Sequence, residues 1–374
     1  MTKNLIVGLM FFVLTCASGC LTRPTQPSVA HQDTPAPTQL PVPAKQSLGP
    51  PAQFPPMPVP PPSAVVIVVE ENKDLLDITG VNGDYPNAPY LKSLAERGAT
   101  FNNMYALHHP SQPNYLELFS GTSQGVINDC CPLQKCQPQS CADSGDCPDP
   151  VPSGPAPFDG PSLGGRLISM GMTFTGYAED LPKDNIRACC GGFYARKHCP
   201  WLEFKDVPEK NPHGCDRRKN PEGCAPTTKD FSEFLPDVGN YRLPTVSMVI
   251  PNLINDMHSP IPYSYDFSTA TQVRNGDDWL RQNIEPYVKW AMQHNGLLII
   301  TWDESRSGCA PCNTFPPGNG IPTFFVGPMV KPGYQSDYVY SHYNLLRTIE
   351  DLYGVRPLGG SAAVVPISDI WVNP

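Results

Sequence analysis

Basic residues are scarce in this chain of 374 residues, which contains 26 Lys and Arg against 35 Asp and Glu and has a formal net charge of −9. It also lacks a basic run, so bulk electrostatic binding of nucleic-acid backbones is disfavoured and we expect no nucleic-acid partner. Charged residues make up only 16% of the chain and hydrophobic residues 40%, which disfavours a fibrous or wholly disordered protein. The length fits one large α/β domain or two small ones.

Long apolar runs are missing after the N-terminal region, so no later segment is predicted to span a membrane. The run Leu5–Ala17 follows the basic Lys3 and is too short for a stable span, as in an export signal. It ends in Ala-Ser-Gly-Cys at residues 17–20, which resembles a bacterial lipobox in which Cys20 is lipidated. An ordinary secretory signal is the alternative. Both predict export, and the lipobox predicts a lipid-anchored cell-envelope protein, periplasmic or at the surface.

Residues 21–63 are rich in proline and almost without aromatic side chains, so this segment cannot bury a core and should be extended. We therefore predict a lipoprotein-type signal peptide over 1–20, a linker over 21–63 and a folded domain over 64–374. The linker would hold the domain away from a membrane anchor. A proline-rich ligand for a partner protein is the alternative.

Cysteine is abundant, with 14 residues, of which two fall in the predicted signal. The other twelve could form at most six bridges, and ten of them lie within Cys130–Cys224. In an exported protein this density predicts a disulfide-rich insertion at about 129–230. Structural zinc is the alternative, but the CxxC at Cys309 and Cys312 has no second CxxC at zinc-ribbon spacing.

The apolar patterns predict an α/β fold. Continuous apolar runs predict buried parallel strands at 64–69, 245–250, 297–302 and 322–326. Helical patterns with caps and glycine stops cover 87–98, 277–294 and 341–353. Such alternation predicts a mostly parallel central sheet covered by helices on both faces. Residues 129–230 break this rhythm and offer one candidate strand at 172–177.

Acidic, amide and histidine side chains follow three of the predicted strands. In open parallel sheets, ligands bind outside the carboxyl ends of the strands, and oxygen ligands gathered there suit a divalent cation. Taken singly, each residue could instead be a solvated loop residue or a helix cap. The residues that follow these strands are Glu70, Glu71 and Asn72, then Asp256 and His258, and then Asp303 and Glu304.

Ser111 is the candidate nucleophile. Pro110 keeps the residue before it out of helix, so Ser111 is predicted to cap a helix that runs to Ser120 and stops at Gly121. A helix N-terminus holds phosphate through its free N–H groups and its partial positive charge. A serine there, beside a metal, would lose its proton more easily and attack phosphorus. A plain capping serine is the alternative.

Six ordered motifs lie within about 64–128 and 230–356. They are Glu71-Asn72, His109-Pro110-Ser111-x-Pro113-Asn114-Tyr115, Pro251-Asn252-x-x-Asn255-Asp256-Met257-His258, Gly276-Asp277-x-Trp279-Leu280, Thr301-Trp302-Asp303-Glu304 and Ser341-His342-Tyr343-x-Leu345-Leu346. Together they resemble the bacterial phosphoesterase family of acid phosphatases and phospholipase C-type enzymes, within the alkaline-phosphatase-like superfamily. The resemblance implies an alkaline-phosphatase-like α/β sandwich and a hydrolase of phosphoric esters.

The resemblance also implies a divalent metal ion, whose identity it leaves open. The metal ligands would be Glu71, Asn72, Ser111, Asp303 and Glu304. Further contributions to the site are expected from Asp256, which would orient His258 or cap a turn, and from Asn114 and His342. Glu70 is expected to be a bystander.

The same resemblance implies the catalytic roles. Ser111 would form a phosphoserine intermediate, and Asn72 would contact a phosphoryl oxygen. His109 and His258 would surround the phosphate, as charge stabilisers or as the acid that protonates the leaving oxygen. A cation and fixed donors are what a phosphoryl transition state needs, because its charge spreads over the equatorial oxygens.

The expected substrate is a phosphorylated small molecule or lipid, and a phosphomonoesterase is favoured. A phospholipase C-type phosphodiesterase is the alternative, although no amphipathic helix suggests membrane contact beyond the lipid anchor. A surface lipoprotein that binds ligands without catalysis is a third reading. One departure concerns Asn319, which lies where relatives often carry a histidine just before the Ile-Pro of the next strand.

Overall fold

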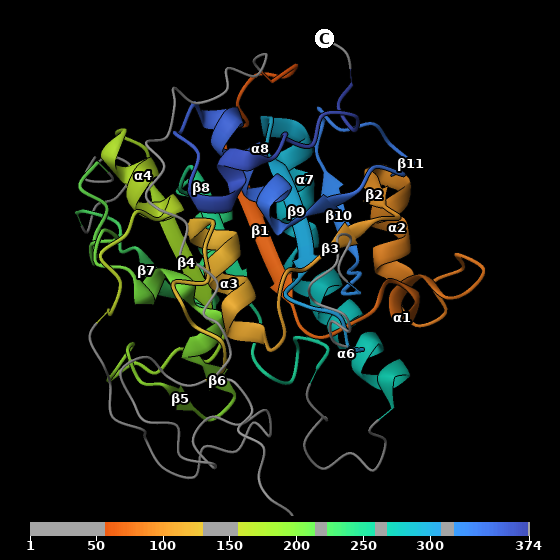
Figure 1. Ribbon diagram of the computed structural model, residues 1–374, viewed down its shortest axis with the longest axis horizontal. Helices are drawn as coiled ribbons and strands as arrows, with labels where there is room; N and C mark the ends of the chain where they lie inside the picture. The colour runs from red at the N-terminus through yellow and green to blue at the C-terminus, as the bar shows by residue number, and fades with distance from the viewer. Residues whose placement is uncertain (1–56, 130–155, 214–222, 259–267, 308–317, 373–374) are drawn as a thin grey trace, which may run out of the picture. The chain divides into compact units, whose positions relative to one another are not determined.

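The computed structural model describes residues 57–129, 156–213, 223–258, 268–307 and 318–372, and Figure 1 gives their arrangement. The predicted signal with Cys20, most of the linker, and the pair Cys309 and Cys312 lie outside the described residues. Within the described ranges, no helix combines the length and the apolar character needed to cross a bilayer.

An eight-stranded sheet forms the core, in the order β11-β2-β10-β9-β1-β8-β4-β7. The parallel strands at its centre and on one side are β9 (Leu297–Trp302), β1 (Val65–Glu70), β8 (Val246–Ile250), β4 (Phe174–Ala178) and β7 (Thr228–Asp230). Beyond β9, β10 (Thr323–Val326) runs antiparallel to β9 and to β2 (Ala99–Phe101), whereas β11 (Tyr334–Ser336) is parallel to β2. Two short ladders pair β12 (Tyr340–Ser341) with β3 (Met104–Tyr105) and β5 (Cys190–Gly191) with β6 (Tyr194–Ala195).

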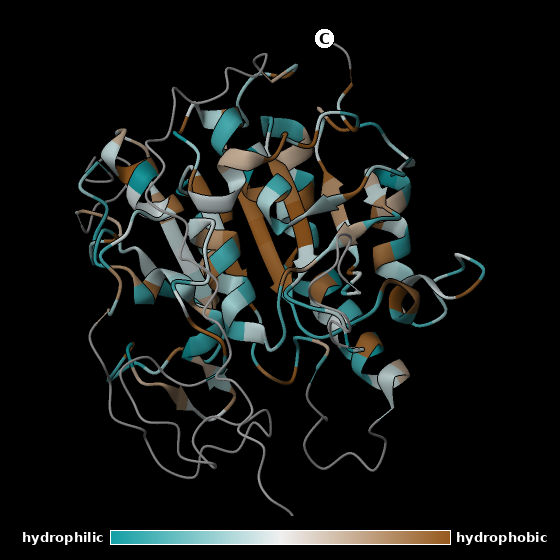
Figure 2. Cartoon of the chain, in the orientation of Figure 1, coloured by the Kyte–Doolittle hydropathy of each residue, from teal (hydrophilic) through white to brown (hydrophobic). Residues whose placement is uncertain are grey.

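The central strands are apolar because both of their faces are covered. Every residue of β1, β8 and β9 is buried, and Figure 2 shows β1 and β9 as hydrophobic ribbons inside the domain. The register pairs Val65 with Leu297 and Glu70 with Trp302, so β1 and β9 end together. The residues that follow them, Glu71 and Asp303, therefore leave the sheet at the same edge.

Helices cover both faces of the sheet. In Figure 1, α3 (Ser111–Ser120) and α8 (His342–Tyr353) lie in front of the strands, and α6 (Thr269–Asn283) and α7 (Glu285–His294) lie behind them. The other helices are α1 (Leu75–Thr79), α2 (Pro89–Arg97), α4 (Leu163–Ser169) and α5 (Phe234–Gly239), with 3₁₀ turns η1 (Arg196–His198), η2 (Pro200–Glu203), η3 (Phe231–Glu233) and η4 (Gly359–Ala363). The predicted fold class, a mostly parallel sheet covered by helices, is confirmed.

Two predicted elements differ in detail. The helix predicted at 277–294 consists of α6 and α7, separated at Ile284. Pro286 explains the break, because a proline lacks an N–H and is tolerated only in the first turn of a helix, where it lies in α7. The strand predicted at 322–326 exists as β10, but it is antiparallel to β9 rather than parallel.

The region predicted as an insertion contributes directly to the central sheet. Its candidate strand at 172–177 corresponds to β4, and β7, near the end of the region, forms an edge of the sheet. Trp201 packs on β4 at Gly176, where an added Cβ would lie 2.0 Å from the indole ring. The region is therefore fastened to the core by backbone pairing as well as by side-chain packing.

The described cysteines differ in state. Cys189, Cys190 and Cys224 are disulfide-bonded, whereas Cys199 is a buried free thiol. The twelve cysteines that follow residue 20 therefore do not form six bridges. The bridge pattern itself lies outside the described residues.

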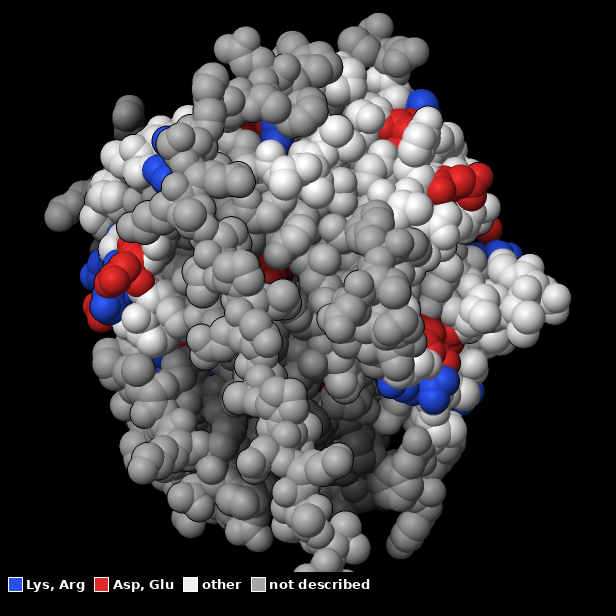
Figure 3. Space-filling view, viewed as in Figure 1, with Lys and Arg blue, Asp and Glu red and all other residues white. Residues whose placement is uncertain are grey.

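Charged side chains of the described residues form small mixed groups on the face drawn in Figure 3. Exposed ion pairs in the domain include Lys205–Asp159 at 2.8 Å and Arg306–Asp77 at 3.0 Å. Such pairs are screened by water and salt and contribute little to stability. The fold rests mainly on the apolar sheet and its helices.

Candidate active site

Residues from separate parts of the chain meet at the carboxyl edge of the parallel strands. The loop after β1 supplies Glu71 and Asn72, the loop after β9 supplies Asp303 and Glu304, and the start of α3 supplies Ser111. All five are buried. The sequence prediction that these side chains converge is confirmed by their contacts.

Glu71 is the centre of this group and is fully buried. Its Oε2 accepts hydrogen bonds from Ser111 Oγ at 3.1 Å and from Asn72 Nδ2 at 2.6 Å. Its Oε1 accepts a hydrogen bond from Tyr115 OH at 2.8 Å and lies 3.0 Å from His198 Nε2. The two oxygens of one carboxylate thus have separate sets of partners.

Ser111 is the first residue of α3, and Pro110 takes the cap position. The Ser111 hydroxyl does not bond to a helix N–H but lies 3.1 Å from Glu71 Oε2 and 3.2 Å from Glu304 Oε1. The prediction that Ser111 caps the helix is therefore wrong. The hydroxyl therefore points at carboxylates rather than at the helix backbone.

Asp303 and Glu304 complete a cluster of three buried carboxyl groups. Asp303 Oδ1 accepts a hydrogen bond from Asn72 N at 3.0 Å, while its buried Oδ2 has no hydrogen-bond partner. Glu304 Oε2 lies 2.5 Å from His109 Nδ1, a contact that lacks ordinary hydrogen-bond geometry. Both carboxyl groups point into the space beside Ser111.

The cluster carries more negative charge than its surroundings balance. Burial and the nearby Glu71 raise the pKa of Asp303 well above its usual range and that of Glu304 to about 9. Burial also acts to raise the pKa of Glu71, but His198 and His258 outweigh it and hold that pKa well below its usual range. A cation among the three carboxylates would remove this conflict.

The donor set fits a hard divalent cation. It offers carboxylate oxygens, the Ser111 hydroxyl and the Asn72 side chain, with the unpartnered Asp303 Oδ2 among them. In the described part of the chain, no three His, Cys, Asp or Glu side chains already form a metal-binding cluster. The fit of this site to a cation therefore rests on the chemistry of its donors. Two of them, Ser111 and Asn72, are neither acids nor histidines.

His258 approaches the cluster from the loop after β8. Its Nδ1 lies 3.2 Å from Asn72 Nδ2 and 3.6 Å from Glu71 Oε2. Burial lowers the pKa of His258, but Glu71 and Asp256 outweigh it, so the pKa is raised. Asp256 Oδ1 accepts a hydrogen bond from the backbone N–H of His258 at 2.9 Å, so Asp256 fixes the turn rather than the ring.

Two asparagines hold the loops around Ser111. Asn114 Oδ1 accepts hydrogen bonds from the backbone N–H groups of Leu107 at 3.0 Å and His108 at 2.8 Å. Asn319 Nδ2 donates to His108 O at 2.6 Å, and its Oδ1 accepts from Ser305 N at 2.7 Å. Asn319 thus ties the loop before the nucleophile to the loop of Asp303 and Glu304.

His342 does not contact the carboxylate cluster. It is fully buried at the start of α8, and its Nε2 lies 2.9 Å from Trp302 O. Burial lowers the pKa of His342 to about 4, so the ring is neutral near pH 7 and can donate a hydrogen bond to this carbonyl. His342 thus contacts the last residue of β9.

Sequence reasoning assigned no role in the site to Tyr115, which it noted only within a motif, or to His198 and Lys197. Tyr115 lies one helical turn after Ser111, so the spacing of four residues could have placed it on the same face of α3. Lys197 Nζ lies 2.7 Å from Asp129, whose other oxygen accepts a hydrogen bond from Gln112 N at 2.9 Å. No local sequence pattern assigns His198 or Lys197 to the site, because both reach it only through the tertiary packing of the region after α3.

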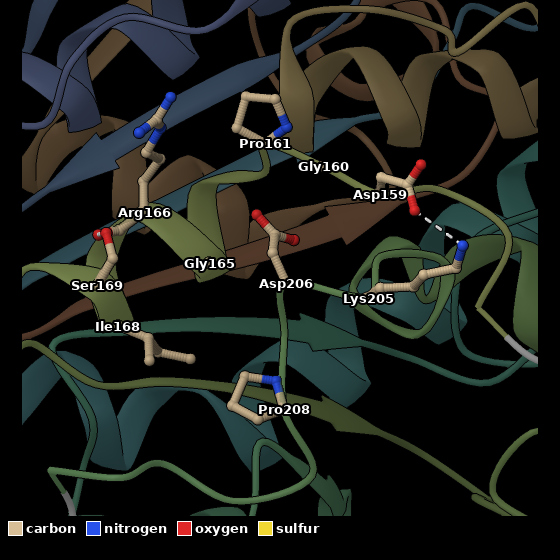
Figure 4. Close-up of a pocket in the computed structure, with 10 residues that line it drawn as sticks. All are labelled: Asp159, Gly160, Pro161, Gly165, Arg166, Ile168, Ser169, Lys205, Asp206 and Pro208. Carbon is tan, nitrogen blue, oxygen red and sulfur yellow. Dashed lines mark hydrogen bonds and ion pairs between the residues drawn. The ribbon is translucent and has the colours of Figure 1, made fainter.

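A cavity of about 590 Å³ lies elsewhere, beside α4 (Figure 4). Its lining includes Asp206, whose carboxylate accepts hydrogen bonds from Ser162 N at 2.9 Å and Ser162 Oγ at 2.8 Å. Lys205, at its edge, pairs with Asp159. The cavity contains none of the predicted site residues, and the contacts of Asp206 fix the start of α4.

Known proteins resemble this chain in sequence. The phosphatidylinositol-3-phosphatase of Mycobacterium tuberculosis is 39% identical over 82% of this chain and 82% of its own length. An acid phosphatase of Aspergillus fumigatus is 25% identical over 78% of this chain and 57% of its own length. A solved structure from Vibrio parahaemolyticus, of a protein in the alkaline phosphatase superfamily, has a TM-score of 0.47 and 16% identity, over 80% of this chain and 68% of that one.

The sequence pattern of the phosphoesterase family matches residues 81–356. This range includes Ser111, Asp303 and Glu304 and begins after Glu71 and Asn72. The match covers most of the chain and agrees with the relationship to the mycobacterial phosphatase. The chain belongs to the phosphoesterase family and is a hydrolase that acts on phosphoester bonds.

Proposed function

We propose that this hydrolase is a metal-dependent phosphoric monoester hydrolase, similar to acid phosphatases, and that Ser111 forms a phosphoserine intermediate. The observation that carries the proposal is the position of the Ser111 hydroxyl, 3.1 Å from Glu71 and 3.2 Å from Glu304. A buried serine between two carboxylates has acceptors for its proton.

The proposed metal ligands are oxygen atoms around the Ser111 hydroxyl. A bound divalent cation would neutralise the carboxylates and stabilise the negative charge that develops on the phosphoryl group. The residues that would hold it are Glu71, Asn72, Ser111, Asp303 and Glu304. The unpartnered, buried Asp303 Oδ2 supports this assignment.

In the proposed reaction, Ser111 Oγ attacks phosphorus while the bond from phosphorus to the leaving oxygen breaks. The serine proton passes to a neighbouring carboxylate, and His258, whose Nδ1 lies 3.2 Å from Asn72 Nδ2, gives a proton to the leaving oxygen. Asn72 and His109 contact the phosphoryl oxygens. Water then hydrolyses the phosphoserine, which releases inorganic phosphate and restores the Ser111 hydroxyl.

The relatives support monoesters as substrates. Their names specify a phosphatidylinositol-3-phosphatase and an acid phosphatase, and both activities remove a terminal phosphate. We therefore infer that this chain acts on a phosphate monoester of a small molecule or of an inositol lipid. A lipid substrate would agree with the lipid anchor that we propose at Cys20. A Cys20→Ala variant that stayed in the membrane fraction would contradict that anchor.

The test compares hydrolysis of p-nitrophenyl phosphate and p-nitrophenylphosphorylcholine by the oxidised protein, with and without chelator. We expect chelator-sensitive release from the monoester alone, and a loss of at least about 1000-fold in the Ser111→Ala variant. Ser120→Ala, at the far end of the same helix, serves as the matched control and should keep its activity. Release mainly from the diester would contradict the monoesterase assignment. Full activity of Ser111→Ala would exclude the phosphoserine.

A further inference from the structure

The region after α3 delivers one histidine directly to the carboxylate cluster. His198 ends the turn η1, and its side chain is only 2% exposed. Its ring stacks on Tyr115, with ring centroids 5.0 Å apart and an interplanar angle of 16°. Its Nε2 lies 3.0 Å from Glu71 Oε1. Stacking and contact together fix the ring in one orientation.

The two oxygens of Glu71 have different surroundings. Oε1 is contacted by Tyr115 OH at 2.8 Å and by His198 Nε2 at 3.0 Å. Oε2 is directed toward Ser111 Oγ and Asn72 Nδ2. Tyr115 OH donates to Oε1, and the His198 ring nitrogen lies against the same oxygen without ordinary hydrogen-bond geometry, so Oε1 has little room for a further ligand.

We propose that His198 is a positioning residue for Glu71, and this inference rests on the proposed function. Together with Tyr115 it holds Oε1, so that the carboxylate cannot rotate and Oε2 alone faces Ser111 and the cation. Residues that orient a metal ligand in this way usually change metal affinity or activity about 10- to 100-fold when they are replaced.

The setting of His198 is rigid enough for this task. The preceding Arg196 is fully buried and forms an ion pair with Glu203, with Nε 2.7 Å from Oε1. The Arg196 backbone N–H donates to Cys189 O at 2.9 Å, and Trp201 in η2 packs on Gly176 of the central sheet. The turn that carries His198 is therefore held from both sides.

The test uses two substitutions that separate ring packing from the donor nitrogen. His198→Phe keeps a ring that can stack on Tyr115 but removes the nitrogen, whereas His198→Gln keeps an N–H donor. The matched control is His213→Phe, at an exposed histidine of the same region. Binding of Mg²⁺, Mn²⁺, Ca²⁺ and Zn²⁺ to chelator-stripped protein is measured by calorimetry, and kcat and KM are measured with p-nitrophenyl phosphate.

We expect His198→Phe to weaken cation binding about 10- to 100-fold and to lower kcat more than it changes KM. His198→Gln should stay within about tenfold of the unaltered protein, and His213→Phe should match it. Equal cation affinity and equal kcat in the unaltered protein and in His198→Phe would overturn the inference. That result would leave the proposed function intact.

Two further outcomes are decisive. If His198→Phe loses its native near-ultraviolet circular dichroism, His198→Met replaces it, because Met and Gln have similar length and only Gln donates. Equal cation affinity in the Met and Gln variants would then overturn the inference. If the unaltered protein binds none of the four cations, the metal part of the proposed function fails, and the role of His198 fails with it.

Discussion

The strand ends and the turn η1 hold their site residues by different means. Glu71 and Asp303 follow β1 and β9, whose backbones are fixed by continuous parallel pairing up to Glu70 and Trp302. His198 lies on a turn of three residues that is held by side chains, among them the Arg196–Glu203 ion pair. The sheet therefore positions the groups to which we assign the chemistry, whereas the region after α3 contacts one of them, Glu71. Substitutions in the two regions should therefore have different measurable effects.

The strongest expected effect lies at the sheet edge. Replacing Asp303 by Asn removes a carboxylate whose Oδ2 has no protein partner and which we assign to the cation. Because a cation supplies several kcal/mol of charge stabilisation, kcat should fall about 1000-fold, with loss of cation binding in calorimetry. Asp278→Asn, on the exposed side of α6, is the control. Normal cation affinity in Asp303→Asn would remove Asp303 from the ligand set.

The next largest effect is expected where the two regions touch, at the contact between Gly176 and Trp201. Gly176→Ala places a Cβ 2.0 Å from the ring of Trp201, so η2 has to move away from β4. Overpacking of this kind costs about 2 kcal/mol, to be measured as the free energy of unfolding in denaturant. Gly239→Ala is the control, because nothing lies within 4 Å of its added Cβ. If both variants were equally stable, Trp201 would not fasten this region to the sheet.

A further expected effect is a pH dependence that arises in the buried core. Burial lowers the pKa of His342 to about 4. As the pH falls from about 6.5 toward this value, the unfolded chain takes up a proton that the folded chain does not, so stability decreases. Relative to the unaltered protein, His342→Gln should reduce this loss by up to about 1.4 kcal/mol per pH unit.

The measurement is the free energy of unfolding between pH 4 and 7, with His294→Gln at the end of α7 as the control. Gln keeps a donor for Trp302 O, so the hydrogen bond itself is retained in the variant. Parallel pH profiles of the unaltered protein and His342→Gln would contradict the buried, neutral state of His342.

The sequence predicts the sheet edge well because its signals are local. Glu71 and Asp303 directly follow apolar runs that can only be buried strands, and the edge of a parallel sheet then brings them together. The direction of β10 was not predictable, since an apolar run has the same pattern in either orientation. Pro286 was a visible signal for the break between α6 and α7.

His198 could not be predicted from the sequence. It lies 127 positions after Glu71, in a stretch without hydrophobic periodicity, and its contact depends on how η1 and Trp201 pack on the sheet. The role of Ser111 as a helix cap was predicted from a general preference. In the structure the Ser111 hydroxyl instead lies against carboxylates on two loops. A carboxylate oxygen can accept a hydrogen bond from the hydroxyl, whereas a helix N–H cannot.

The order of strands limits how this protein could be shortened. β8 is flanked by β1 on one side and by β4 on the other, and β4 and β7 both come from the cysteine-rich part of the chain. A version trimmed of that whole part would leave β8, a strand of five buried residues, as an open edge that could pair with other molecules and aggregate. A minimal unit that keeps this sheet therefore retains residues 174–178 and 228–230, and the chain between them also carries His198 and Trp201.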